Sequence, residues 1–299
     1  MKAIAKPAGI DAHNRLVGVI LVAISAAAFG TLAIFGRYAY AQGMSTLTIL
    51  AYRFTLAAVL MGIILALRRE RFPRGSILLR LVGMGAIGYV GQAFTYFTAL
   101  KYASAGLVAL LLYLYPLFVT LLSAVFLRER IAGLKWVALA LAVAGVALTA
   151  GPERGQLPGI LLAITAALLY SAYIIVASQV MKEVSAIQSS TVIFASAGIM
   201  SAFLAWVSKV PVTIPDSGWW VIASIVLVAT VIPVTTFLAG LARIAASDAA
   251  MLSTLEPVVT VLLAAGLFGE LLAPLTLLGG GLILTAVLLV SRSEIHKPL

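Results

Sequence analysis

The sequence contains no cysteine, and this absence excludes a disulfide framework, a thiolate metal site and a cysteine nucleophile. Its two histidines, His13 and His296, lie in the polar terminal segments, outside every apolar run. The apolar runs also lack a Ser/His/Asp set and paired aspartates, and no GxxxxGK(S/T) loop for binding ATP is present. The sequence therefore predicts no enzyme, no metal site, no cofactor and no direct use of ATP.

Charged residues are scarce as well, at 10% of the chain, and 20 Lys and Arg against 10 Asp and Glu give a net charge of +10. In a soluble protein, this excess of basic residues would suggest a nucleic-acid partner. Here the basic residues lie in the connections between apolar runs, where membrane topology explains them. We therefore expect no nucleic acid among the partners.

Apolar residues are what the sequence has in excess. They make up 63% of the chain and give a mean hydropathy of +1.15, whereas a soluble domain contains about 45–50% apolar residues. They form ten runs of roughly 20 residues, the length at which a helix crosses a hydrocarbon core about 30 Å thick. The runs are Leu16–Gly36, Ser45–Leu67, Ile77–Leu100, Ser104–Leu127, Leu134–Ala150, Leu157–Val180, Ala186–Val207, Gly218–Leu241, Ala246–Phe268 and Pro274–Val290. This pattern predicts an all-α membrane protein with ten transmembrane helices.

Two stretches of the chain repeat one pattern. Leu111–Glu129 and Leu252–Glu270 each hold an apolar run that is broken by a proline and ends at a glutamate. The same offset of 141 residues pairs positions elsewhere, such as Gly18 with Gly159 and Tyr96 with Phe237. The chain is therefore predicted to consist of two five-helix units, residues 16–150 and residues 157–291.

The odd number of helices in each unit has a consequence for topology. The second unit must enter the membrane from the side opposite to the first, so the two units form inverted repeats. Inverted repeats related by an axis in the membrane plane can expose one central site to either side in turn. This arrangement favours a transporter, since a channel or a membrane enzyme does not need alternating access.

Glu256 is the one acidic residue well inside an apolar run, about ten residues from its start, or roughly 15 Å deep at 1.5 Å per residue. A lone carboxylate at that depth is costly, so it is expected to be protonated, paired or facing water. Two interpretations are open. Glu256 either couples proton movement or binds a substrate amine, or it is a structural residue satisfied by the helix break at Pro257.

Arg53 is the one basic residue deep in a run, in the segment AYRFTLA. It can bind the carboxylate of a substrate. Because it lies eight residues from the outer end of its run, it can instead extend to the interface or cap a neighbouring helix. The structural interpretation is the preferred one.

Polar aromatic residues recur at helical spacing on one face of the third run, and the fourth and sixth runs add further tyrosines. Such a stripe is unfavourable against lipid, so these residues are expected to line a central cavity and bind substrate, with ordinary aromatic packing as the alternative. The set is Tyr89, Gln92, Tyr96, Tyr113, Tyr170 and Tyr173. All ten tyrosines lie in the first 173 residues, so the lining is asymmetric and suits an organic solute better than an ion path.

Three prolines interrupt apolar runs, namely Pro116, Pro233 and Pro257. Each removes a backbone hydrogen bond and bends its helix, and the freed carbonyls are tolerated in a membrane where they meet protein or line a cavity. We expect these prolines to act as hinges or scaffold rather than to bind substrate. Glu129 and Glu270, which end the repeated stretch, are interpreted as interface anchors.

The ten runs, the doubled P-x12-E pattern, the AYRFTLA segment and the LEPVVTVLLAAGLFGE segment resemble the drug/metabolite transporter superfamily of the EamA type. The resemblance covers essentially the whole chain, which looks most like the YddG-type aromatic amino acid exporters. It implies an inner-membrane exporter of small metabolites, with a central cavity built largely from the first, third, fourth, sixth, eighth and ninth helices. The family's glutamate before proline corresponds to Glu256.

Taken with this resemblance, the residues predict a secondary transporter that exports amino acids, aromatic or hydrophobic ones first, or similar small amphiphilic metabolites by alternating access. The alternatives are an exporter of drugs, nucleosides or sugar-type metabolites, and an uncoupled facilitator. The expected partners are a small-molecule substrate and the lipid bilayer.

Basic residues predict the orientation of the chain and provide a test of it. With the N-terminus in the cytoplasm, fifteen Lys and Arg residues fall inside and four fall outside, so both termini are expected to be cytoplasmic. Because the chain has no cysteine of its own, single cysteines can report the topology. We expect an impermeant thiol reagent on whole cells to label a cysteine at position 155 and to leave one at position 72 unlabelled. The reverse pattern would contradict this topology.

Overall fold

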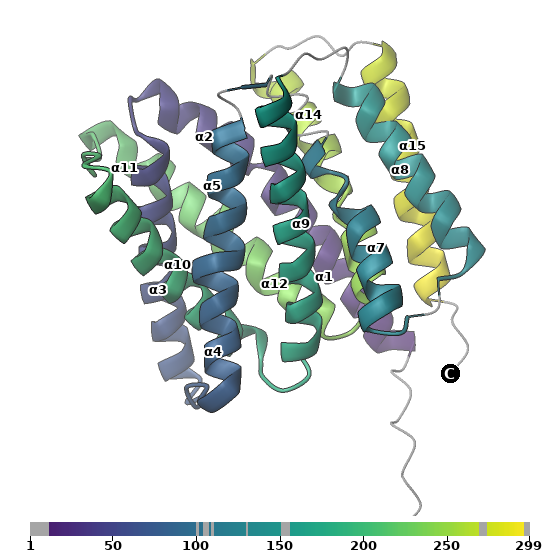
Figure 1. Ribbon diagram of the computed structural model, residues 1–299, viewed down its shortest axis with the longest axis horizontal. Coiled ribbons are helices and arrows are strands. Elements are labelled where there is room, and N and C mark those ends of the chain that lie inside the picture. Colours follow the sequence, from purple (N-terminus) through teal and green to yellow (C-terminus); the bar gives the residue numbers. More distant parts are fainter. Residues whose placement is uncertain are drawn as a thin grey trace, which may run out of the picture.

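The computed structural model describes residues 12–99, 102–103, 108, 111–129, 131–150, 156–268 and 274–295. The elements assigned within these residues are all helices, and they pack into one bundle (Figure 1). Glu270, interpreted above as an interface anchor, lies outside the described residues. The predicted all-α class is confirmed.

The helix bounds follow most of the predicted apolar runs within a few residues. The helices of the first half are α1 (Ala12–Gly30), α2 (Leu32–Ala41), α3 (Thr46–Leu67), α4 (Gly75–Gly83), the π-helical segment η1 (Met84–Tyr89), α5 (Val90–Ala99), α7 (Tyr115–Phe126) and α8 (Gly133–Ala150). The helices of the second half are α9 (Leu157–Val180), α10 (Ala186–Val207), the 3-10 segment η2 (Asp216–Gly218), α11 (Trp219–Val226), the π-helical segment η3 (Leu227–Val231), α12 (Ile232–Leu241), α13 (Ala246–Leu252), α14 (Leu255–Phe268) and α15 (Pro274–Ile295).

Seven helical segments among the described residues are long and apolar enough to cross a membrane. They are Ala12–Ala41, Thr46–Leu67, Gly75–Tyr96, Leu157–Val180, Ala186–Val207, Asp216–Leu241 and Ala246–Leu267. Three further apolar helices are shorter, namely Tyr115–Phe126, Gly133–Leu148 and Leu277–Val290. The chain is therefore a multi-pass membrane protein, while the count of ten crossings remains a prediction.

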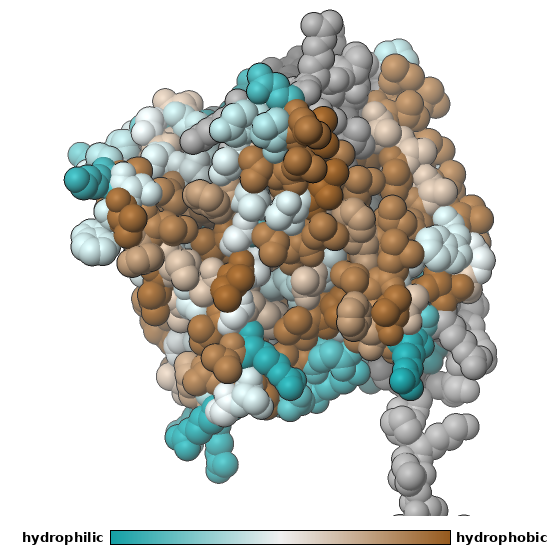
Figure 2. All heavy atoms as spheres, viewed as in Figure 1, coloured by the Kyte–Doolittle hydropathy of each residue, from teal (hydrophilic) through white to brown (hydrophobic). Residues whose placement is uncertain are grey.

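The surface of the bundle matches a lipid environment. Figure 2 shows apolar residues spread across the middle of one face, with hydrophilic residues gathered along its lower edge. Leu67 and Ile199 are among the large apolar side chains that are exposed, and so are Trp206, Trp219 and Trp220. Soluble proteins rarely expose apolar surface this extensively. This surface therefore suits contact with lipid.

Helix pairs that join the two halves hold the bundle together. α3 packs on α10, α1 on α12, α5 on α9 and α8 on α15, and Figure 1 shows α8 and α15 side by side at the right edge. α1 and α12 approach closely, because a Cβ added to Gly240 would lie 3.0 Å from the Gly18 carbonyl oxygen. Small residues allow this kind of close approach between membrane helices.

The paired helices α3 and α10 begin in the same way. The Ser45 side chain accepts a hydrogen bond from the Thr48 amide at 3.1 Å, and the Ser185 side chain accepts one from the Gln188 amide at 3.1 Å. The Gln188 side chain in turn accepts from the Ser185 amide at 2.9 Å. These caps satisfy N–H groups that the first helical turn leaves free. Each serine therefore determines where its helix starts.

Prolines mark the points at which helices are interrupted. Turns at residues 113–114 and 253–254 precede α7 and α14, and Pro116 and Pro257 lie in the first turns of those helices. Pro233 lies at the start of α12. Proline is tolerated at Pro116 and Pro257, because the N–H groups of a first turn have no partner within the helix, whereas α12 continues directly from η3. A hinge at these breaks remains a prediction.

Two π-helical segments interrupt helices at places that the apolar pattern did not predict. η1 lies between α4 and α5, and η3 lies between α11 and α12. In η3 the Thr230 hydroxyl donates to the Ile225 carbonyl, five residues earlier, at 2.7 Å. In η1 the backbone at Gly85 packs directly on α10, where an added Cβ would collide with the Ile193 carbonyl. Segments of this type are rare and are frequently found at functional sites.

Candidate functional site

Arg53, on α3, is almost completely buried, with 6% of its surface exposed. Its Nε donates to the Thr230 hydroxyl at 2.6 Å, and its Nη2 donates to the Tyr89 hydroxyl at 3.1 Å and to the Ala229 carbonyl at 3.2 Å. The guanidinium carbon lies 5.0 Å from the centre of the Phe54 ring. Arg53 therefore does not extend to the interface. It binds a neighbouring helix, as one of the two structural interpretations expected.

The bond to Ala229 lies one helical turn before Pro233, which has no N–H and removes one donor from this part of the helix. A carbonyl without a donor is costly inside a membrane, and Arg53 donates to the Ala229 carbonyl from another helix. The break in helical bonding around Pro233 and the bond from Arg53 therefore lie side by side.

The bonds of Arg53 connect the two π-helical segments. Tyr89 is the last residue of η1, and Ala229 and Thr230 lie in η3. One guanidinium thus joins an interrupted helix of the first half to an interrupted helix of the second half. Sequence reasoning identified Arg53 and Tyr89 as candidates and missed Thr230. The only signal for Thr230 was a polar residue within an apolar run.

Five tyrosines, which we call the tyrosine cluster, form a continuous chain of ring contacts next to this arginine. Their neighbouring centroids lie 4.8 to 6.3 Å apart. In order of contact the cluster is Tyr89, Tyr173, Tyr170, Tyr115 and Tyr113. It draws on η1, α9, α7 and the turn before α7. It brings together four of the predicted residues, from three separate runs, and adds Tyr115.

Glu256 lies in the first turn of α14, at the edge of the tyrosine cluster. The Tyr113 hydroxyl is next to its carboxyl group, and Arg53 lies within electrostatic range. Among the described residues, no direct ion pair joins Arg53 and Glu256. The site therefore holds both Arg53 and Glu256. Each lies close to a tyrosine, and the two are not in direct contact.

Two predicted site residues lie further along α5. Gln92 is half-buried, and Tyr96 packs with Ala99, Val108 and Ala163 in a small separate apolar cluster. Tyr96 nevertheless remains within electrostatic range of Glu256. The structure thus brings Arg53, Glu256 and the tyrosines into one region, and substrate contact by any of them remains a prediction.

A groove of about 870 Å³ lies elsewhere, between α3 and α10. Its walls are mostly apolar and include Ala51, Thr55, Ala202 and Trp206. The groove shares no lining residue with the tyrosine cluster, so it is distinct from the predicted site.

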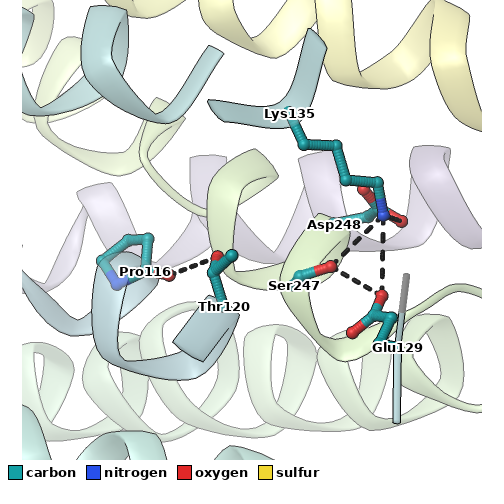
Figure 3. A network of polar contacts seen from close by, with 6 residues as sticks. All are labelled: Pro116, Thr120, Glu129, Lys135, Ser247 and Asp248. Carbon is teal, nitrogen blue, oxygen red and sulfur yellow. Dashed lines mark hydrogen bonds and ion pairs between the residues drawn. The ribbon is translucent and has the colours of Figure 1, made fainter. Parts of the chain in front are cut away.

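A second buried polar group was not predicted. Lys135, in the first turn of α8, is 2% exposed, and its Nζ lies 2.7 Å from Asp248 Oδ2, 3.3 Å from Ser247 Oγ and 3.5 Å from Glu129 Oε1 (Figure 3). The Ser247 hydroxyl donates to Glu129 Oε1 at 2.6 Å. One ammonium group therefore holds two carboxylates from different parts of the chain.

This group corrects one interpretation of the sequence. Glu129 is not an interface anchor, because its side chain is 15% exposed and bonded to Ser247 and Lys135. Asp248, at the start of the apolar run that contains Glu256, is completely buried. Lys135 and Asp248 stand near the ends of their apolar runs, where charged residues usually meet water.

The Arg53 contacts predict the effect of removing one acceptor. Thr230→Val keeps the shape of the side chain and deletes the acceptor of Arg53 Nε, and a hydrogen bond to a charged group contributes about 1.5–3 kcal/mol. We expect a lower thermal unfolding temperature for this variant in detergent. Thr285→Val is the matched control, because the Thr285 hydroxyl is exposed and donates within α15, to the Gly281 carbonyl at 2.8 Å. Equal unfolding temperatures for the two variants would contradict this account.

Several relatives align with most of the chain. The uncharacterized transporter YcbK of Bacillus subtilis is 25% identical over 90% of this chain and 91% of its own length. An uncharacterized transporter of Archaeoglobus fulgidus is 28% identical over 92% of this chain and 96% of its own. The uncharacterized inner membrane transporter YedA of Escherichia coli is 24% identical over 82% of this chain and 81% of its own. These names state no substrate, so they do not support the finer likeness to aromatic amino acid exporters.

A solved crystal structure has the same fold. It superposes with a TM-score of 0.79 over 91% of this chain and 95% of its own length, at 22% identity. The EamA-like transporter family matches the chain twice, over residues 16–151 and over residues 157–292. Together the two matches account for nearly all of the sequence, and the chain belongs to the EamA-like transporter family.

Proposed function

We propose that this protein is a secondary transporter that exports amino acids or similar amphiphilic metabolites, with aromatic or hydrophobic amino acids as the expected substrates. Its membership of a membrane transporter family is given by the two family matches. The observation that carries the substrate class is the meeting of Arg53, Glu256 and the tyrosine cluster in one buried region. The chemistry of each of the three parts fits one part of an amino acid.

The arginine suits a carboxylate. A guanidinium binds a carboxylate through parallel N–H bonds, and among the described residues the Nη1 of Arg53 makes none of the hydrogen bonds of this side chain. The Tyr89 hydroxyl is the acceptor that a substrate carboxylate can most readily replace, because it is not a backbone group like the Ala229 carbonyl and its 3.1 Å bond is longer than the 2.6 Å bond to Thr230. Arg53 can therefore bind an anion while it keeps its bonds to η3.

Glu256 and the tyrosine cluster suit the rest of the molecule. A carboxylate in low dielectric attracts an ammonium group strongly, and Glu256 lies near Arg53 without contacting it. Tyrosine rings offer apolar faces for a hydrophobic side chain and hydroxyl groups at their edges. A zwitterion with an apolar tail would thus find a partner for each of its charges and for its tail.

Alternating access between two inverted units is part of the proposal. The two family matches relate position 16 to 157 and position 151 to 292. Helices α7 and α14 both restart after a two-residue turn, with a proline in the first turn of each. Matching breaks in two copies of one unit favour a pair of hinges around a shared site. The name of YedA, an inner membrane transporter, favours the inner membrane as the location.

Transport in proteoliposomes tests the proposed function. We expect the purified protein to move at least one amino acid from a panel that also contains nucleosides, sugars and hydrophobic drugs. Tyr170→Ala, in the tyrosine cluster, should reduce this transport at least tenfold. Tyr52→Ala is the matched control, because the Tyr52 hydroxyl bonds the Val212 carbonyl outside the cluster. Transport of nucleosides, sugars or drugs alone would replace amino acids as the substrate class.

Glu256→Gln tests whether the carboxylate couples transport to protons. Glutamine keeps the shape and hydrogen-bonding capacity of the side chain and removes its ability to exchange a proton. We expect the variant to exchange substrate at equilibrium while losing the stimulation of transport by a pH gradient. Glu183→Gln, at an exposed position on the connection after α9, should behave as the wild type. If the wild type shows no dependence on the gradient, the protein is an uncoupled facilitator.

A further inference from the structure

The four residues Glu129, Lys135, Ser247 and Asp248 join the two halves of the chain at one end of the bundle. Figure 3 shows the Lys135 side chain reaching from its helix toward the other three. Glu129 lies in the connection between α7 and α8, and Ser247 and Asp248 lie in the first turn of α13. The Lys135–Asp248, Lys135–Ser247 and Ser247–Glu129 contacts each cross from the first half to the second. The two halves cannot separate at this end without breaking all three.

Burial and charge give this group a different character from the apolar contacts around it. Lys135 and Asp248 are 2% and 0% exposed, and the ammonium contacts Asp248 Oδ2 at 2.7 Å inside the bundle rather than at its surface. When such a pair separates into water, each charge regains its hydration, which offsets much of the lost attraction. Apolar surface exposed to water receives no such compensation. The group therefore suits a contact that has to open and close repeatedly.

The position of the group connects it to the candidate site. α13 carries Asp248 near its start and Ala250 near its end, and the Ala250 carbonyl accepts a hydrogen bond from the Tyr115 hydroxyl at 3.4 Å. Tyr115 is the first residue of α7, and Glu129 follows the end of the same helix. α7 and α13 pack against each other. These two short helices thus link the charged group at one end to the tyrosine cluster at the other.

The group has no counterpart in the repeated pattern. Under the offset of 141 residues, Lys135 corresponds to Thr276 and Asp248 corresponds to Leu107. Neither replacement can form an ion pair. The corresponding end of the other unit therefore cannot be closed by the same charges, and any stabilisation by this group favours one of the two access states over the other.

We propose that Glu129, Lys135, Ser247 and Asp248 form an ionic latch that holds the bundle closed at this end. By the predicted topology, this end faces the cytoplasm. The latch must be broken and hydrated for the site to open there, so its strength determines how much of the protein occupies the closed state. This proposal rests on the proposed alternating access. It adds the contact that favours the state in which this end of the bundle is closed over the state in which it is open.

Distance measurements on a neutral variant test the latch. The chain lacks cysteine, so spin labels can be attached at Phe126→Cys, on the end of α7, and Ala242→Cys, after α12, and their separation measured by double electron–electron resonance. The test variant combines Lys135→Met, Glu129→Gln and Asp248→Asn, which removes the three charges of the group together. We expect the longer-distance population to rise at least threefold in this variant.

An exposed ion pair provides the matched control. Arg80 and Glu183 also join the two halves, at 3.7 Å, but their side chains are 51% and 48% exposed. Exposed pairs contribute little to stability, so Arg80→Gln combined with Glu183→Gln should leave the distance distribution unchanged. An equal shift in this control would show that any lost charge pair has the same effect, and would overturn the latch.

Two further outcomes of the test decide against the proposal. A neutral variant that folds, as judged by a single symmetric elution peak, and keeps the wild-type distances shows that the charges do not hold this end closed. A neutral variant that fails to fold assigns the four residues to the permanent scaffold. Because the distances are measured without any solute, failure to transport amino acids would count against the proposed function and leave the latch result standing.

Discussion

A backbone carbonyl that loses its helical donor inside a membrane must find another donor within the protein. Pro233 removes one donor from the helix next to η3, and Arg53 donates to the nearby Ala229 carbonyl from α3. The same guanidinium binds Thr230 in η3 and Tyr89 at the end of η1. This one requirement therefore determines how three helices lie relative to each other. The tyrosine cluster begins at Tyr89, so its position depends on the same requirement.

Signals between neighbouring residues predicted where most helices lie. They did not predict contacts between residues far apart in the sequence. Apolar runs, serine caps and prolines act within a few residues of themselves, so helix bounds could be estimated from the sequence alone. The main partner of Arg53 stands 177 positions further along the chain, and no pattern pointed to it. The π-helical segments were missed for a related reason, since they depend on the packing of η1 against α10 and on the contact between η3 and Arg53.

The buried charges show a different weakness of sequence reasoning. Lys135 and Asp248 stand near the starts of apolar runs, where charged residues usually lie in water, so neither was singled out from the sequence. Their burial arises because α13 packs on both α7 and α8, which brings the two residues together across 113 positions. A pair of opposite charges at the starts of two runs was the available signal. These opposite charges could not be predicted to form a pair without knowing which helices pack against each other.

Tyr115 and Glu256 occupy the same place in the two halves, directly before a proline, yet they carry different chemistry. Each meets the opposite half: Tyr115 donates to the Ala250 carbonyl, and Glu256 lies beside Tyr113. Two identical subunits would present the same residue at both places, and could offer a solute only matching groups. Joining both copies in one polypeptide frees each position to diverge. The two halves of one chain can therefore present unlike groups at equivalent places, as Tyr115 and Glu256 do.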